Sequence, residues 1–330
     1  MRIFKRKLYD KLLEWKNNRH GKTAVLIEGA RRVGKSTLTK QFAENEYESY
    51  VMIDFSIVRD DVLELFNHID DLDYFFLQLQ FRLGVSLKER KSLVIFDEVQ
   101  KCPKARQAIK HLVADGRYDY IETGSLISIK KNVKDILIPS EEEKLFLYPM
   151  DYEEFKWALG DNTAIPQLRM LFDKKLSIGD AVTRKLMRDF RIYMVVGGMP
   201  QAVDTYIDTN NLMEVDRVKR NIIQLYEDDF YKIDSSGRLS MLFDAIPAQL
   251  NSNASRYQVA SAIGNNTDSE KVLQLISELR ESMTINMAYH ANDPGVGMSL
   301  VMNLNKYKMY IGDTGLFITL AFKDKDFTEN

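Results

Sequence analysis

"TAVLIEGARRVGKST", residues 23–37, joins a run of apolar residues to a loop that carries two glycines and a lysine. The spacing from Gly29 to Gly34, Lys35 and Ser36 satisfies G-x-x-x-x-G-K-[ST], the phosphate-binding loop known as Walker A. The loop follows a strand-like segment, which is the context that this motif requires. The stretch therefore predicts an α/β fold of the P-loop NTPase type, with a nucleotide held where the first strand ends.

The residue types of this loop suit the binding of phosphate. Glycine lets the backbone turn its N–H groups toward an anion, and the helix that follows adds the positive end of its dipole. Lys35 is expected to neutralise the β- and γ-phosphates, and the Ser36 hydroxyl is expected to ligate Mg²⁺. The residues predicted to contact the nucleotide here are Gly29, Ala30, Arg31, Arg32, Val33, Gly34, Lys35, Ser36 and Thr37.

"SLVIFDE", residues 92–98, places two carboxylates directly after an apolar run. Ligands of a parallel sheet sit at its carboxyl edge, so Asp97 is expected to help hold Mg²⁺ there, which is the Walker B role. Glu98 is the predicted general base, because a carboxylate beside the metal-binding aspartate can polarise an attacking water. Solvated loops also carry such pairs, but the phosphate loop upstream favours the catalytic interpretation.

"YDYIETGS", residues 118–125, ends in two hydroxyl side chains, Thr123 and Ser125. If this strand lies between the phosphate-loop strand and the Asp97 strand, one hydroxyl could sense the γ-phosphate or hold the attacking water. Thr123 is the preferred candidate for this role. The alternative is structural, since Thr and Ser also end many strands as simple caps.

Five apolar runs alternate with helix-like stretches in the first 150 residues. Such alternation predicts a parallel sheet covered by helices on both faces. A further helix is expected before the first strand, where "IFKRKLYDKLLEW" (3–15) spaces apolar residues at helical intervals. The predicted strands are "TAVLIE" (23–28), "YVMIDF" (50–55), "SLVIFDE" (92–98), "YDYIETGS" (118–125) and "KLFLYPM" (144–150).

The pattern changes near residue 150, where Asp151 and Glu154 are spaced as a capping box that opens a helical region. Further on, three short helical segments precede two strand-like runs, "TINMAYH" (284–290) and "MSLVMNL" (298–304), the order of a winged helix. The predicted domains are a P-loop core at 1–150, a helical lid at 151–235 and, at 236–330, a winged helix with the start of a C-terminal region.

Composition and charge limit the class of protein. The net charge of −2 offers no overall field that would attract nucleic acid or a membrane. Residues 1–40 hold twelve Lys or Arg against three Asp or Glu. A solvated amphipathic helix leading into the anion-binding loop is preferred to a nucleic-acid arm, because a basic patch alone is weak evidence for nucleic-acid binding. One cysteine, Cys102, excludes an intrachain disulfide. With no signal peptide or apolar run of membrane-spanning length, a cytoplasmic location is expected.

Six ordered motifs spread over nearly the whole chain resemble a family of bacterial and archaeal AAA-type ATPases related to the STAND switch ATPases. The resemblance implies a P-loop core and a helical lid, followed by a domain of unknown function that contains a winged helix. It also implies a core sheet with the glutamate-bearing strand inserted beside the phosphate-loop strand. The motifs are "GARRVGKSTL", "SLVIFDEVQKCP", "IETGS", "LYPMDYEEF", "YMVVGGMPQAV" and "KYKMYIGDTGLF".

Two further implications come from the same resemblance. In these relatives a glycine-any-proline segment approaches the bound nucleotide, and the matching residues are Gly198, Met199 and Pro200. "GGMP" also suits a simple helix end, and both roles can hold together. Relatives often continue after "DTGL" into a nuclease-like region; this chain ends soon after Leu316, so no nuclease activity is inferred.

The predicted function is Mg²⁺-dependent binding of ATP and its hydrolysis to ADP, used as a conformational switch between core, lid and winged helix. The alternatives are an ATP-dependent nucleic-acid-processing factor and a nucleotide-loaded scaffold with negligible turnover. The segment "DSEKVLQLISELRES" (268–282) carries four acidic residues against two basic ones, so reading of DNA by this helix is disfavoured and a protein partner is preferred. No arginine finger can be assigned, and Arg31 and Arg32 have no assigned role.

Overall fold

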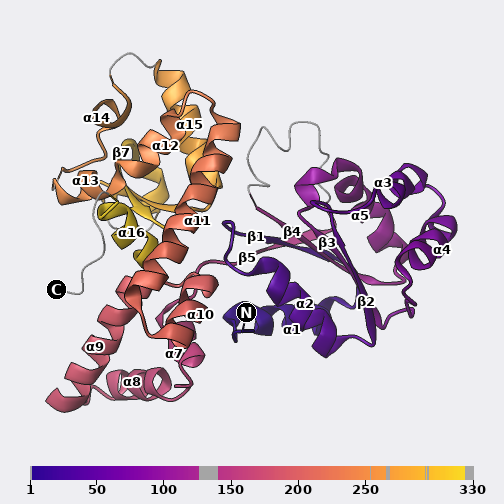
Figure 1. Cartoon of the computed structure of the whole chain (residues 1–330), viewed down its shortest axis with the longest axis horizontal. Coiled ribbons are helices and arrows are strands. Elements are labelled where there is room, and N and C mark those ends of the chain that lie inside the picture. The colour runs from indigo at the N-terminus through magenta and orange to yellow at the C-terminus, as the bar shows by residue number, and fades with distance from the viewer. Residues whose placement is uncertain are drawn as a thin grey trace. The chain divides into compact units, whose positions relative to one another are not determined.

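The computed structural model describes residues 2–125, 140–252, 254–264, 268–293, 295 and 297–323. The chain divides into two units. We call Lys5–Tyr148 the core unit, and Met1–Phe4 together with Pro149–Asn330 the C-terminal unit. Figure 1 draws both units, and each is described by itself below.

The five apolar runs of the core unit form one parallel sheet (Figure 1). Its strand order is β2-β3-β4-β1-β5, and every neighbouring pair is parallel. The predicted α/β fold is therefore confirmed. The strands are β1 (Ala24–Glu28), β2 (Ser49–Asp54), β3 (Ser92–Asp97), β4 (Asp119–Gly124) and β5 (Glu142–Phe146).

Helices cover both faces of this sheet, as continuous apolar strands require. In Figure 1, α1 (Lys7–Arg19) and α2 (Lys35–Glu46) lie on one side of the sheet, and α3 (Asp60–Leu63) and α5 (Pro103–Asp115) lie on the other. Short 3₁₀ turns, η1 (Glu64–His68) and η2 (Val99–Lys101), and the helix α4 (Leu72–Leu83) complete the unit. Every residue of β1, β3 and β4 is buried as a result.

Alternate residues of the strands supply the main core on the side of α4 and α5. Leu26 of β1, Phe96 of β3 and Tyr120 of β4 belong to one cluster with aromatic and aliphatic side chains from those helices. Phe66, Phe75 and Phe76 form edge-on contacts within it, at centroid separations of 5.1–5.2 Å between successive rings. This packing fixes the sheet register, and the register in turn fixes which residues meet at the carboxyl edge.

The sheet order corrects one expectation drawn from the resemblance. The strand that ends before Glu98, β3, does not lie beside the phosphate-loop strand β1, because β4 lies between them. The register pairs β1 with β4 and β4 with β3. The structure instead meets the condition stated for Thr123, because its strand, β4, lies between the phosphate-loop strand β1 and the Asp97 strand β3.

The C-terminal unit begins with five helices: α7 (Tyr152–Ala158), α8 (Ala164–Asp173), α9 (Asp180–Val196), α10 (Pro200–Thr209) and α11 (Leu212–Ile233). The predicted capping box is present at the first of them. The Asp151 carboxylate accepts the Glu154 N–H at 2.9 Å, and the Glu154 carboxylate accepts the Asp151 N–H at 3.3 Å. The helical character expected after residue 150 is confirmed.

The rest of this unit combines short helices with a hairpin. The strands β6 (Ile285–Ala291) and β7 (Met302–Ile311) pair antiparallel, and η3 (Met298–Leu300) precedes β7. The strand expected at 298–304 thus begins later and runs on into "KYKMYI". The winged helix and the domain limits 151–235 and 236–330 stay predictions. The helices are α12 (Arg238–Asp244), α13 (Ile246–Asn251), α14 (Val259–Ile263), α15 (Ser269–Glu281) and α16 (Thr314–Ala321).

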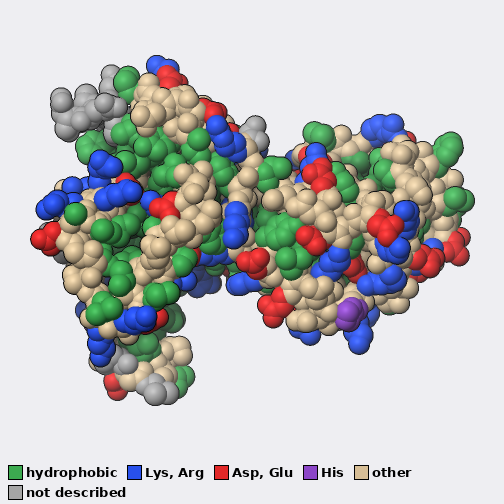
Figure 2. Space-filling view, turned by 90° about the horizontal axis from the view of Figure 1, so that it is seen from below, with side chains coloured by type: hydrophobic (Ala, Val, Ile, Leu, Met, Phe, Trp, Pro, Cys, Tyr) green, Lys and Arg blue, Asp and Glu red, His purple; other side chains and the backbone are tan. Residues whose placement is uncertain are grey.

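Two further observations concern the described residues. Among them, no helix combines the length and apolar character needed to cross a membrane. On the face drawn in Figure 2, basic and acidic side chains are interspersed rather than gathered into one field of a single sign. That face agrees with the small net charge of the sequence.

Candidate functional site

The carboxyl ends of β1, β3 and β4 bring the candidate residues to one edge of the sheet. Ile27 is in register with Thr123, and Phe96 is in register with Glu122. The next residue of β3, Asp97, therefore stands level with Thr123, and the loop that follows β1 leaves from the same edge. Ligands of parallel sheets bind at this edge, and the predicted loop and acidic residues converge there.

The loop requires glycine at its two glycine positions for different physical reasons. Gly34, the residue before α2, has φ of 99°, a left-handed value that a side chain would strain. Gly29 is needed for close approach, since a Cβ atom there would lie 2.3 Å from the carbonyl oxygen of Leu147. Together they hold the loop against the end of β5 and start α2 at Lys35, so that the free N–H groups of its first turn border the loop.

Lys35 lies folded over the loop. Its Nζ donates to the carbonyls of Gly29 at 2.9 Å and Ala30 at 3.0 Å, and the residue is 5% exposed. Burial lowers the pKa of this ammonium to about 8, against the opposing attraction of Glu98 and Asp97. A cation taken out of water in this way gains from any anion that reaches the loop.

Ser36 and Asp97 form the predicted metal-binding pair. The Ser36 hydroxyl donates to Asp97 Oδ1 at 2.9 Å, and the Thr123 hydroxyl donates to the same oxygen. Burial raises the pKa of the Asp97 carboxyl, and these two hydrogen bonds oppose that change. The structure thus brings Ser36, Asp97 and Thr123 into one contact group.

Glu98 is held in an unusual backbone conformation, with φ of 55° and ψ of 45°. Such a value is strained for glutamate, and strained residues concentrate at functional sites. Its Oε2 accepts from Gln100 Nε2 at 2.7 Å and from the Ser125 hydroxyl at 3.1 Å, and its N–H points to Thr123 Oγ1 at 3.4 Å. The carboxylate is therefore held by two side chains, and the backbone of Glu98 is directed at the Thr123 hydroxyl.

The other residues predicted to contact the nucleotide differ in their exposure. Arg32 is exposed with φ of 69°, Arg31 and Thr37 are half-buried, and Val33 is fully buried. Pro200 belongs to the C-terminal unit, where it is the buried first residue of α10. Its predicted approach to a nucleotide stays a prediction.

Two partners of Glu98 were not singled out from the sequence for this role. Ser125 was noted as a strand-end hydroxyl but ranked behind Thr123, and Gln100 was not considered. The only signal in the sequence is their closeness to the motifs, since Gln100 follows Glu98 by two residues and Ser125 follows Thr123 by two.

The oxygen atoms at this edge suit Mg²⁺, which prefers hard oxygen ligands. Ser36 supplies a hydroxyl and Asp97 a carboxylate, and these two residues already contact each other. Among the described residues no group of three or more His, Cys, Asp or Glu could by itself hold a metal ion. Mg²⁺ held mainly by phosphates and water needs only one or two protein ligands, so this donor set fits the ion.

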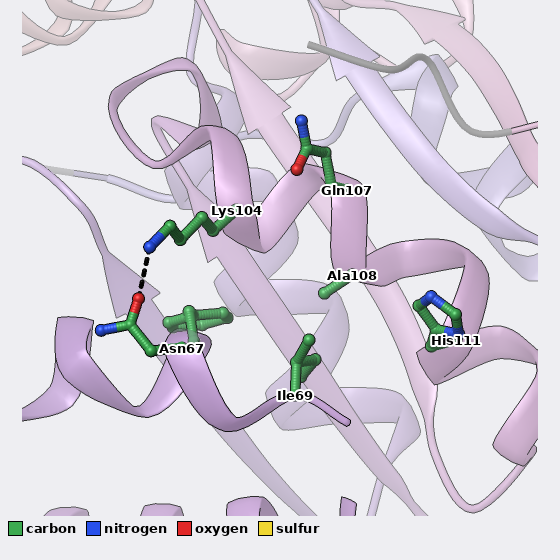
Figure 3. A pocket seen from close by; sticks show the side chains of 7 residues that line it. Asn67, Ile69, Lys104, Gln107, Ala108 and His111 are labelled. Atoms are coloured by element: carbon green, nitrogen blue, oxygen red, sulfur yellow. Dashed lines mark hydrogen bonds between the residues drawn. The ribbon is translucent and has the colours of Figure 1, made fainter. Parts of the chain in front are cut away.

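A separate hollow of about 470 Å³ lies between η1 and α5 in the core unit (Figure 3). Lys104 donates to Asn67 Oδ1 at one side of it, and His111 stands at the other. It is lined by Phe66, Asn67, Ile69, Lys104, Gln107, Ala108 and His111. None of the predicted site residues lines this hollow, so it is not part of the candidate site.

Comparison with solved structures supports the same fold. A Walker-type ATPase of Pyrococcus abyssi is similar over 96% of this chain and 96% of its own, with a TM-score of 0.56 and 16% identity. AMPPCP-bound DnaA from Aquifex aeolicus matches over 84% and 88% at 12% identity, with a TM-score of 0.36. A STAND protein with a tetratricopeptide repeat sensor from Pyrococcus horikoshii matches over 98% and 43% at 11% identity, with a TM-score of 0.36.

The first of these likenesses, at 16% identity, establishes the fold alone. No curated protein matches the chain. Residues 21–156 match a family model described as an AAA domain, and residues 187–326 match a domain of unknown function, DUF8612. Residues 21–156 thus carry an AAA domain, and the chain continues into a domain whose function is unknown.

Proposed function

We propose that the chain binds ATP with Mg²⁺ at the 29–37 loop and hydrolyses it to ADP and phosphate. The observation that carries the proposal is the hydrogen bond of 2.9 Å between the Ser36 hydroxyl and Asp97. This bond joins Ser36, the predicted Mg²⁺ ligand of the phosphate loop, to Asp97, the predicted Mg²⁺ ligand at the end of β3. The AAA family match over the same residues supports this reading.

Each residue has a distinct role in the proposal. Lys35 leaves the carbonyls of Gly29 and Ala30 to neutralise the β- and γ-phosphates, exchanging two neutral acceptors for charged ones. Ser36 and Asp97 hold Mg²⁺, which supplies charge neutralisation at the phosphates when bound. Glu98 takes the proton of the attacking water, and Gln100 and Ser125 fix its carboxylate for that purpose. Thr123 positions Asp97 through its hydroxyl.

We further propose that turnover acts as a switch on the C-terminal unit. The resemblance suggests that the "GGMP" segment senses nucleotide through Pro200. In support, this segment has a specific buried structure: the Gly198 N–H donates to Asp313 Oδ2 at 2.6 Å, and Met199 and Pro200 are buried. A segment that only ended a helix would not need the buried carboxylate of Asp313, which lies 115 residues further along the chain.

Two observations weigh against the nucleic-acid alternative. The α15 helix shows Glu270 and Glu281 on its polar side, and Glu278 is buried and bonded to Gln274 at 2.9 Å. On the accessible side of the helix, Lys271 and Arg280 are balanced by Glu270 and Glu281, so it does not offer the excess of basic side chains that a DNA-reading helix presents to base edges. We therefore favour a protein partner for this unit.

The test is nucleotide titration and phosphate release on the full chain, with Lys40→Ala as matched control, since Lys40 lies exposed on the same helix as Lys35. Parent and control should bind ATP and release phosphate, Lys35→Ala should lose binding, and Glu98→Gln should bind without turnover. ATP binding by the parent with no release above that of Glu98→Gln would instead identify a nucleotide-loaded scaffold. Equal binding by Lys35→Ala and the parent would refute the site.

A further inference from the structure

Arg6 is a buried cation at the start of the core unit, next to the first residue of α1. Only 5% of its surface is exposed. Its Nη1 donates to the Val33 carbonyl at 2.8 Å, and its Nη2 donates to the Tyr148 carbonyl at 2.6 Å. An arginine stays charged at any working pH, so its burial is costly unless its donors are used, and these two bonds use both ends of the guanidinium fork.

The first of these partners belongs to the phosphate loop itself. Val33 is the residue before Gly34, and its side chain is fully buried. A carbonyl turned toward Arg6 cannot also turn toward a bound phosphate, where it would repel the anion. Arg6 therefore stabilises the loop conformation in which the N–H groups, and not this carbonyl, are available to phosphate.

The second partner belongs to residues 147–150, which we call the exit segment because it follows β5 and leaves the core unit. The first residue of the exit segment, Leu147, also contacts the end of β1 and the first residue of the phosphate loop. The Leu147 N–H donates to the Glu28 carbonyl at 2.8 Å, and the Leu147 carbonyl occupies the space that a side chain at position 29 would need. The start of the exit segment is thus bonded to the residue before the loop and shares one arginine with the loop.

The far end of the exit segment is held within the C-terminal unit. The Met150 N–H donates to the Gly198 carbonyl at 2.7 Å, and the Met150 carbonyl accepts from the Tyr193 hydroxyl at 3.0 Å. A Cβ at position 198 would lie 2.0 Å from the Met150 carbonyl oxygen, so the approach requires glycine. Gly198 is in turn bonded to Asp313, the buried cap of α16.

We propose that Arg6 is a positioning residue of the phosphate loop, and that by holding Val33 and Tyr148 together it makes the exit segment report loop occupancy to the Gly198–Asp313 pair. The inference rests on the proposed nucleotide site and adds the route by which that site is coupled to the C-terminal unit. The route consists of the Arg6 side chain, the backbone of residues 147–150 and the turn that contains Gly198. A lysine at position 6 has a single ammonium and cannot match the fork that reaches both carbonyls.

The experiment compares Arg6→Gln and Arg6→Lys with the control Arg19→Gln, because Arg19 is an exposed arginine at the other end of α1 that pairs with Glu143. Calorimetric titration with ATP and Mg²⁺ should give at least about tenfold weaker binding for Arg6→Gln, the scale of losing charge-assisted bonds, and an intermediate loss for Arg6→Lys. The control should match the parent. Circular dichroism verifies the fold, and Arg6→Lys keeps the test open if Arg6→Gln does not fold.

A second measurement separates coupling from a merely structural role. Hydrogen exchange is followed in the peptide that contains Leu147 and Met150, at saturating ATP and without it. In the parent, ATP should slow exchange of the Met150 amide; in the Arg6 variants at saturation, this protection should be lost while the amides of α2 remain protected. Met150 protection that is unchanged between parent and variants would overturn the coupling.

The outcomes also separate this inference from the function it rests on. If the parent does not bind ATP, or Lys35→Ala binds it as tightly as the parent, the nucleotide site is refuted. If the parent binds, Lys35→Ala does not, and Arg6→Gln behaves as Arg19→Gln does, the site stands and the role of Arg6 is wrong.

Discussion

Lys219 offers a test of the buried polar group that surrounds the "GGMP" turn. This lysine of α11 is 1% exposed, and its Nζ donates to the Val195 carbonyl at 2.7 Å and the Gly315 carbonyl at 3.3 Å. Asp216 lies 4.0 Å away, and Asp313 and Arg220 also act on it electrostatically. Burial outweighs the two carboxylates and lowers the pKa of the ammonium to about 8.

The direction of the pH effect follows from proton binding. The ordinary lysine pKa of 10.5 applies to the unfolded chain, so between pH 8 and 10.5 the unfolded state binds more protons than the folded state. The free energy of unfolding must therefore rise with pH across this window. Integrating the difference in bound protons for Lys219 alone from pH 8 to pH 10 gives a gain of about 2 kcal/mol.

The assay is urea unfolding of the parent, Lys219→Met and the control Lys232→Met at pH 8, 9 and 10. Lys232 lies on the same helix with its side chain largely exposed, so its removal should leave the pH dependence of the parent. Lys219→Met should lack the contribution of about 2 kcal/mol, whatever its stability at pH 8. Parallel curves for the parent and Lys219→Met would show that Lys219 keeps its charge throughout, and would refute the burial argument.

Three predictions concern the nucleotide site. Lys35→Ala should abolish tight ATP binding in calorimetry with an unchanged circular dichroism spectrum; unchanged affinity would refute the loop assignment. Glu98→Gln should retain ATP binding and slow phosphate release by about a hundredfold or more, the scale of losing a general base, and equal release rates would make Glu98 structural. Pro200→Ala should reduce the shift in melting temperature that ADP produces, because that shift reports affinity; identical shifts at several ADP concentrations would leave "GGMP" as a helix end only.

The presence of the strands was predictable, because a short apolar run between two helical stretches seldom forms anything else. The ends of the strands and their order in the sheet were not predictable. The fifth strand was expected at 144–150 and lies at Glu142–Phe146. Among the described residues it pairs with β1 alone, and such an edge strand tolerates charged residues, which hide it from a hydrophobic pattern. Leu147, which completes the apolar pattern, still bonds to Glu28 but belongs to the exit segment.

The contacts of the candidate site were predictable where two residues serve one ligand. Ser36 and Asp97 were both assigned to Mg²⁺, and residues that share an ion must lie near each other, so their contact needed no knowledge of the sheet order. The contact between Thr123 and Asp97 was not predicted, because it depends on that order, which entered the sequence analysis only as a condition for a role of Thr123 at the γ-phosphate or the attacking water. The sheet order is set by side-chain packing across strands that are far apart in the chain.

Arg6 shows the limit of the sequence most clearly. It is one of twelve basic residues in the first forty, and this excess favoured a solvated amphipathic helix. A sequence pattern describes the average character of neighbouring residues. The burial of one arginine depends instead on which carbonyls lie close to it in the fold, and one of them, that of Tyr148, is 142 residues away along the chain. Because an arginine is too costly to bury without such partners, its burial beside a phosphate loop is itself an argument that the loop must keep one conformation.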